Sequence, residues 1–131
     1  MGAYSKTFND IVDAVISPCD ILLADTHKVF HTENALWDTG SMCTFISARI
    51  IQERQLQPFG KDVVSGIGGI VETDTYLVNL RLPSGDMITN LEIMASEYDD
   101  YDVIIGMDVI MHGDFHLDNS SKQSVFSFRI P

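Results

Sequence analysis

The chain has 131 residues, a length that suits one domain with a single hydrophobic core and leaves little room for a second. With 45% hydrophobic and 21% charged residues it can bury enough apolar surface to offset its ordering entropy, which argues against an intrinsically disordered chain. Its 19 acidic and 8 basic side chains give a net charge of −11, which disfavours binding to nucleic acid or to an anionic membrane.

The start of the chain and its cysteine content bear on its location. Residues 1–10 lack the basic start and apolar run of a secretory signal, and no apolar stretch approaches the ~20 residues that span a bilayer. Cys19 and Cys43, the only cysteines, form neither a disulfide framework nor a zinc ligand set, which indicates a reducing compartment. We therefore expect a soluble, cytoplasmic protein, provided that no targeting segment precedes residue 1 in a longer polypeptide.

The first half of the chain has short, often β-branched apolar runs, which predict a mainly β domain. From Ile11 to Ala24 we expect two strands around a turn at Ser17-Pro18-Cys19-Asp20, because proline presets a turn dihedral angle and cannot donate to a β-ladder. Residues His27 to Trp37 continue as a further strand or two. Ser47 to Leu56 predicts a short helix, since Ser47 can cap it and Pro58 stops it.

The second half of the chain predicts three hairpins, each with two apolar arms around a turn of glycine, proline or polar residues. They are the glycine-rich segment Val64–Val71, the pair Tyr76–Leu82 and Met87–Met94 around Pro83-Ser84-Gly85-Asp86, and the pair Phe115–Asp118 and Ser124–Ile130 around residues 119–123. No repeat or interdomain linker is visible, so residues 1–131 are expected to form a single domain.

The candidate chemistry begins at Asp38-Thr39-Gly40, where an apolar strand ending in Trp37 is followed by an aspartate and small residues. A carboxylate held on a tight, backbone-crowded turn needs this composition. Taken alone, the triplet is also typical of an ordinary strand-to-turn junction. Two later segments favour a functional interpretation: the glycine-rich hairpin at Val64–Val71, and the apolar strand from Asp102 that ends in Gly106.

These three segments, in this order, resemble the retropepsin family, the aspartic peptidases of retroviruses and their cellular and bacterial relatives. The resemblance covers about Ile11 to Ile130. It implies an all-β fold, with a closed, barrel-like lobe, one or two short helices and a glycine-rich flap hairpin, and assembly into a homodimer. It also implies that Asp38 is the catalytic aspartate and that Thr39, before Gly40 in the signature, braces the two active-site loops across the dimer.

The same resemblance assigns the remaining segments. It implies that the flap over the substrate comprises Gly66, Ile67, Gly68 and Gly69, and that the Ile67 N–H holds a substrate-bridging water. It further implies that Ile104, Ile105 and Gly106 thread beside the catalytic loop, before a short helix that begins at Asp108–Met111.

General chemistry supports this placement of Asp38. Peptide hydrolysis without a metal or other cofactor needs a base for the water and an acid for the carbonyl oxygen, and two carboxylates that share one proton supply both. The chain holds only one Asp-Thr-Gly, so its second aspartate must come from an identical partner on a twofold axis. The predicted activity is that of an aspartic endopeptidase acting on a peptide or protein substrate.

Three positions depart from the retroviral pattern. Ser41 stands where most retroviral enzymes have alanine, and we expect its hydroxyl to donate to Asp38 and to favour the charged carboxylate, giving a more acidic optimum than in Ser41→Ala. Met42 and Met107 stand where viral enzymes tend to have an ion pair. Because both are apolar, packing can replace that pair, as in the cellular and bacterial members.

Other features leave alternatives open. Phe126, Phe128 and Ile130 alternate with polar residues, which fits a dimer interface strand and a core strand equally. The cleft residues Leu36, Ile67 and Ile104, with Ser41 and the flap glycines, would contact the substrate. The histidine pairs (27 and 31, 112 and 116) have a spacing that would suit a metal on a helix, but the first pair lies in a predicted strand and Gly113 interrupts the second. The acidic run 97–102 lacks the spaced ligands and glycine of a calcium loop, so no metal site is predicted. The alternative function is a catalytically silent peptide-binding or dimerisation module.

Overall fold

The computed structural model describes residues 2–23, 28–66 and 68–131, which form ten strands and two short helices. The helices of these residues are α1 (Ala48–Arg54) and α2 (Met107–Ile110), and neither is long enough to cross a membrane. The strands are β1 (Ala3–Thr7), β2 (Ile16–Leu23), β3 (Val29–Trp37), β4 (Phe45–Ser47), β5 (Gly60–Gly66), β6 (Gly69–Arg81), β7 (Met87–Ser96), β8 (Val103–Ile105), β9 (Asp114–Asp118) and β10 (Val125–Arg129). The expected all-β class is confirmed.

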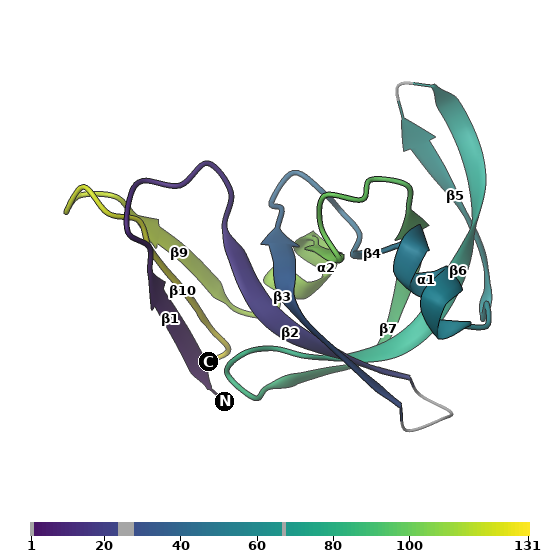
Figure 1. Ribbon diagram of the computed structural model, residues 1–131, viewed down its shortest axis with the longest axis horizontal. Coiled ribbons are helices and arrows are strands. Elements are labelled where there is room, and N and C mark those ends of the chain that lie inside the picture. The colour runs from purple at the N-terminus through teal and green to yellow at the C-terminus, as the bar shows by residue number, and fades with distance from the viewer. Residues whose placement is uncertain (1, 24–27, 67) are drawn as a thin grey trace.

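Six strands close into a barrel in the order β2-β3-β8-β4-β7-β6, because β2 pairs with β3 on one side and with β6 on the other. Strand β5 extends the sheet beyond β6, and the β5–β6 hairpin stands away from the barrel at the upper right of Figure 1. The closed, barrel-like lobe expected from the sequence is therefore confirmed.

The interior of the barrel is filled by alternate residues of its strands. Ala35, Ile46, Ile93, Val103 and Ile105 have no exposed surface. Because successive side chains of a strand point to opposite faces, the residues between them point away from the interior. β-Branched side chains fit such a pleated, buried surface well, so these strands form where the sequence concentrates isoleucine and valine.

A second sheet, in the order β1-β10-β9, brings the two ends of the described chain together, as Figure 1 shows. Sequence analysis did not anticipate β1, which has little apolar character. Phe126 and Phe128 are 0% and 2% exposed and pack on Trp37, with ring centroids 5.1 and 4.8 Å apart, while Ile130 is partly buried against the same core. Core burial thus explains their alternation, and β10, paired on both sides, offers no free edge to a partner strand.

The turn predicted at Ser17-Pro18-Cys19-Asp20 is wrong, because β2 runs straight through these residues and Ile11–Val15 form no strand. The β2–β3 register shifts between Ser17 and Cys19, so Pro18 sits at an irregularity of the ladder. A bulge tolerates the missing N–H of a proline. The Ser17 hydroxyl also accepts a hydrogen bond from the Trp37 indole N–H (2.8 Å), which ties the bulge to the core.

The other predicted elements are confirmed within the described residues. Helix α1 begins after Ser47, whose hydroxyl accepts the Arg49 N–H (3.3 Å), and ends at Gln55 in the left-handed conformation. The three hairpins are β5–β6, β6–β7 and β9–β10, and β3 and β8 occupy the predicted strand regions. The ends of two predicted segments, Ala24 and His27, lie outside the described residues.

A row of charged side chains spans the closure of the barrel. Asp20 is the register partner of His31 on β3 and of Arg81 on β6, and it accepts hydrogen bonds from the Arg81 Nε (2.9 Å) and the His31 Nδ1 (2.6 Å). The pKa of His31 is raised, first by its hydrogen bond to Asp20 and then by the one to Glu33. Burial alone would raise the pKa of Asp20, but hydrogen bonds from His31 and Arg81 lower it below its usual value.

We expect His31→Gln to remove a contribution to the free energy of unfolding that the wild type has at low pH and loses at high pH. Because the folded-state pKa is raised, this contribution is complete below the ordinary value of 6.5 and fades as the pH rises through the folded-state value. Urea unfolding followed by the fluorescence of Trp37, the single tryptophan, should show the two proteins converging above neutral pH. His112→Gln, at an exposed position, is the matched control, and a pH-independent gap for His31→Gln would contradict the assignment.

Candidate active site

Asp38 lies directly after β3, at the point where the chain leaves the barrel. The Trp37 side chain that precedes it is 5% exposed and anchored in the aromatic core, while Asp38 is half-buried. The Asp38 N–H donates to the Ile105 carbonyl (2.8 Å) at the end of the neighbouring β8. Two adjacent strand ends therefore fix the backbone that carries this carboxylate.

The turn after Asp38 folds back on its side chain. The Gly40 N–H donates to Asp38 Oδ1 (2.9 Å), and the Ser41 N–H donates to the Asp38 carbonyl (3.2 Å). A Cβ on Gly40 would lie 3.2 Å from Oδ1, so a glycine suits this position. Asp38 Oδ2 accepts no hydrogen bond from residues 2–23, 28–66 or 68–131, and Thr39 is exposed. The turn thus leaves one carboxyl oxygen of Asp38 without a hydrogen-bond partner among the described residues.

The expected hydrogen bond from Ser41 to Asp38 is not the one the structure shows. The Ser41 hydroxyl donates instead to the Cys43 carbonyl (2.7 Å), two residues along the chain. A local side-chain-to-backbone bond of this kind competes well because it needs little ordering. Ser41 therefore shapes the turn, and the reasoning that tied it to an acidic optimum no longer holds.

A group of hydrogen bonds behind the turn joins it to α2, and the sequence did not predict them. Asp108 accepts two hydrogen bonds from Thr44, one from the N–H (3.0 Å) and one from the hydroxyl (2.6 Å). The same hydroxyl accepts the Gly106 N–H (3.0 Å), and Thr44 has no exposed surface. The only advance signal was an aspartate in the first turn of the expected helix, which favours a helix start but names no partner.

Gly106 is fixed by a close approach of two backbones. A Cβ there would lie within 2.6 Å of the Cys43 carbonyl carbon and 2.9 Å from the Ser41 carbonyl oxygen. The next residue, Met107, donates its N–H to that Ser41 oxygen (2.7 Å). Ile104, Ile105 and Gly106 therefore thread beside the Asp38 turn, as the family resemblance implies.

A row of apolar side chains crosses the barrel strands next to the turn; Leu36, Phe45 and Ile104 are partly exposed and Met94 is buried. Leu36 pairs with Ile104, Ile104 with Phe45, and Phe45 with Met94, on four neighbouring strands. Because register partners share a face, the row lies on the outer face of the sheet. Leu36 and Ile104 were predicted to line a cleft, whereas Phe45 and Met94 were missed because their placement depends on strand pairing.

A pocket of about 320 Å³ opens beside this row. It is lined by Gly40, Ser41, Met42, Cys43, Phe45, Asp62, Val63 and Met94. Two pockets of about 360 and 350 Å³ lie beneath α1, but neither is lined by any residue of the Asp38 turn. The pocket that the turn itself lines is the one placed to hold a group near the carboxylate.

The β5–β6 hairpin ends in the predicted glycine-rich tip. Gly66 pairs with Gly69, Gly68 has open space around it, and Gly69 has a φ of +105°, which non-glycine residues rarely adopt. Ile67 lies outside the described residues. Across the hairpin, the Lys61 ammonium is 3.3 Å from the Asp74 carboxylate and 3.6 Å from that of Glu72. The predicted flap segment is therefore a hairpin tip that projects from the barrel.

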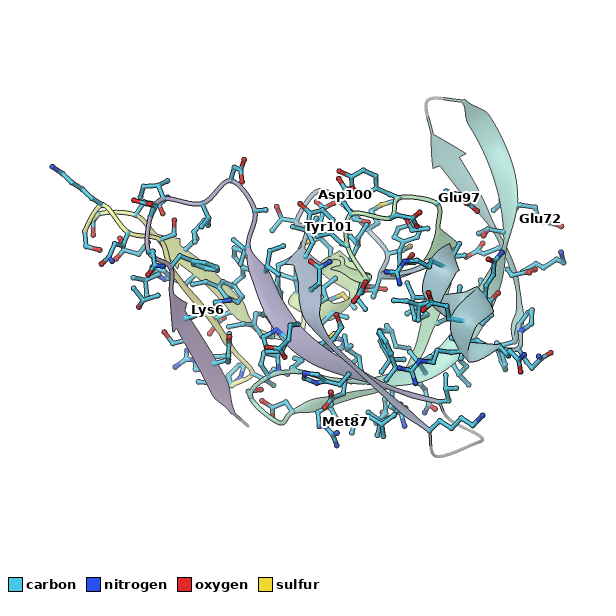
Figure 2. All side chains as sticks on the ribbon, in the orientation of Figure 1. Lys6, Glu72, Met87, Glu97, Asp100 and Tyr101 are labelled. Atoms are coloured by element: carbon cyan, nitrogen blue, oxygen red, sulfur yellow. The ribbon has the colours of Figure 1, made fainter. Side chains whose placement is uncertain are left out.

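The acidic loop between β7 and β8 is held by the barrel. The Asp102 carboxylate accepts hydrogen bonds from the Thr32 hydroxyl (2.6 Å) and from Arg49 (2.8 Å), so it is committed to structure. Figure 2 labels Glu97, Asp100 and Tyr101, which the view places on the same side of the barrel as the loop that follows β3.

Within the described residues, no three histidine, cysteine, aspartate or glutamate side chains are grouped so that they could hold a metal ion.

The model of the spumavirus aspartic protease family (A9) matches residues 30–125. The structure is similar to EIAV protease complexed with the inhibitor HBY-793, with a TM-score of 0.57 at 18% identity over 81% of this chain and 92% of that one. It is also similar to a retropepsin-like aspartic protease from Rickettsia conorii, with a TM-score of 0.55 at 10% identity over 98% and 94% of the two chains. No curated protein sequence matches. At these identities the structural likeness shows the fold alone, and it confirms the retropepsin-like fold.

Gly106→Ala should destabilise the protein by about 3 kcal/mol or more, because the added Cβ would overlap the Cys43 backbone. The measurement is urea unfolding followed by Trp37 fluorescence. Gly68→Ala is the control, since nothing lies within 4 Å of its Cβ, and it should leave the unfolding midpoint nearly unchanged. Equal stability of the two variants would contradict the close approach described above.

Proposed function

Since this chain belongs to the spumavirus aspartic protease family, whose model spans residues 30–125, we propose that it is an aspartic endopeptidase that activates water between the two Asp38 carboxylates of a homodimer. The observation that carries this proposal is the Asp38 turn. It holds a half-buried carboxylate with one oxygen unpartnered among the described residues, next to an apolar row and a pocket.

The proposed reaction needs no group beyond the two carboxylates and a water. One ionised carboxylate takes a proton from the water as it attacks the scissile carbonyl, and the protonated one gives its proton to the carbonyl oxygen. Collapse of the tetrahedral intermediate then breaks the C–N bond; the amine takes the proton that the first carboxyl received from the water, and a hydroxyl of the intermediate returns its proton to the second carboxylate. Two carboxyl groups close enough to share a proton do not both ionise easily, so the pair would titrate in two separate steps. Each turn supplies one such group, which is why the proposal requires two copies.

Exposed methionines beside the turn support the homodimer. Met42 is 82% exposed and Met107 is 37% exposed in the single chain, so neither is packed away as their apolar character would favour. Their backbones flank the turn, because the Met107 N–H donates to Ser41 and the Asp108 N–H donates to the Met42 carbonyl (3.2 Å). A twofold axis near Asp38 would bring these apolar side chains toward a second copy and cover them.

The substrate in this proposal is an extended peptide segment of a protein. The outer row of Leu36, Ile104 and Phe45 would contact its apolar side chains, while the β5–β6 hairpin would close over it. Gly66, Gly68 and Gly69 leave the backbone of that hairpin accessible, and Ile67 would supply the N–H that holds a bridging water. A glycine-rich tip without bulky side chains suits a main-chain contact with a peptide.

Asp38→Asn should abolish cleavage, because an amide can neither accept the proton of the water nor share one with its mate. Digestion of a proteome-derived peptide library, read by mass spectrometry, should show new termini with the wild type and none with the variant. The wild-type rate should be bell-shaped against pH. Glu92→Gln, which removes an exposed carboxylate on β7, is the control and should cleave normally. Peptide binding without any Asp38-dependent cleavage would favour the silent binding module.

Specific activity should rise with protein concentration until the dimer is saturated, because a single chain holds half of the catalytic pair.

Met42→Glu with Met107→Glu should weaken association at least about tenfold, since like charges would face one another near the axis. Sedimentation velocity over a range of concentrations measures this directly. Met87→Glu, at a methionine that is also 37% exposed but lies at the start of β7, is the matched control. A fully active monomer would overturn the shared site.

A further inference from the structure

The pocket beside the Asp38 turn has an uneven chemical lining. Its side chains are largely apolar and include Met42, Cys43, Phe45 and Met94, while its one charged residue is Asp62 on β5. The pocket is lined by Gly40 and Ser41, so a group bound in it would lie beside the turn that carries Asp38. A binding position for a side chain with an apolar stem and a polar end is the natural use of such a lining.

The strand register determines the direction in which Asp62 points. Gly60, Thr75 and Met94 form one row across β5, β6 and β7, and Met94 lines the pocket. Asp62 lies two residues beyond Gly60 on the same strand, so its side chain leaves the same face of the sheet as Met94. The structure accordingly places Asp62 at the wall of the pocket, opposite the catalytic turn.

Lys61, the cation nearest to Asp62 in sequence, does not neutralise its charge. Lys61 leaves the opposite face of the hairpin, where it pairs with Asp74 and Glu72. Among the described residues Asp62 makes no ion pair, and its Oδ1 accepts only the adjacent Val63 N–H (2.7 Å). Burial, followed by the nearby charges of Asp108 and Asp62, raises the pKa of the Cys43 thiol, which is consistent with an uncompensated negative charge at this pocket.

We propose that this pocket is a specificity subsite that takes a lysine or arginine side chain of the substrate, with the methylene stem along Phe45 and Met94 and the cationic end at Asp62. The inference rests on the proposed endopeptidase function and adds a substrate class to it. Long basic side chains bury their stems on apolar surface while the charge stays at a polar rim. A glutamate in the same place is repelled by Asp62, and norleucine fills the apolar part but leaves the carboxylate unpaired.

The test uses fluorogenic decapeptides in which each position in turn carries lysine, norleucine or glutamate, in an otherwise constant sequence. At one position, wild-type kcat/KM should favour lysine over norleucine by roughly threefold to fivefold, as expected for a partly exposed ion pair, and should be lowest for glutamate. Asp62→Asn should bring the lysine to norleucine ratio close to one, and Asp62→Lys should favour glutamate. High salt should reduce the wild-type preference.

Asp74→Asn is the matched control, because it removes the same charge from the opposite face of the same hairpin. It should keep the lysine preference, and a preference that survives in Asp62→Asn or is absent from the wild type overturns the subsite. The same fluorescent peptides, bound to Asp38→Asn and to Asp38→Asn with Asp62→Asn and followed by anisotropy, separate the two proposals. If the wild type cleaves no peptide but binding to Asp38→Asn still prefers lysine, and Asp62→Asn removes that preference, the endopeptidase proposal fails and the subsite proposal stands. If the peptides bind with no preference for lysine, the subsite proposal alone fails.

Discussion

The structure depends on the close crossing of two backbones behind the Asp38 turn. Gly106 lies against the carbonyl groups of Cys43 and Ser41 with no room for a side chain. That contact lets Thr44 reach both the Gly106 N–H and the Asp108 carboxylate. The segments that cross are distant in sequence, since Thr44 and Asp108 are 64 residues apart, and strand pairing within the barrel brings them together. In the proposed dimer, a carboxylate that meets a second one needs a support of this rigidity.

Much of the fold follows from short-range signals in the sequence. A serine cap and a following proline bound α1, glycine-rich turns mark the hairpins, and small residues after Asp38 mark a tight turn. What could not be read locally depends on pairing between distant strands. Pro18 suggested a turn because its missing N–H is visible in the sequence, whereas the bulge that accommodates it exists only opposite β3. Thr44 and Asp108, 64 residues apart, give no joint signal in the sequence. The Ser41 hydroxyl was assigned to Asp38 because both lie in one motif, whereas the direction of the side chain, toward the Cys43 carbonyl, depends on the folded turn.

The pocket beside the Asp38 turn lies between barrel strands and the projecting hairpin. Phe45 on β4 and Met94 on β7 line it from the barrel, while Asp62 and Val63 line it from β5, the strand that extends the sheet beyond β6. Charge is divided between the faces of that hairpin, because Lys61 and its acidic partners lie on one face and Asp62 lies on the other. The pocket is therefore negative like the chain as a whole, whose net charge is −11, because Asp62 lines it while Lys61 lies on the opposite face of the hairpin.

The sheet that holds both ends of the described chain contributes no residue to this pocket. Its central strand is flanked by β1 and β9, and the Ile130 N–H donates to the Gly2 carbonyl (3.2 Å). Ends that are hydrogen-bonded neighbours can be linked by a few residues, and the exposed turn at 119–123 offers a place to open new ones. The topology is thus compatible with circular permutation, in which the order of the segments changes while the barrel, the hairpin and the Asp38 turn keep their connections.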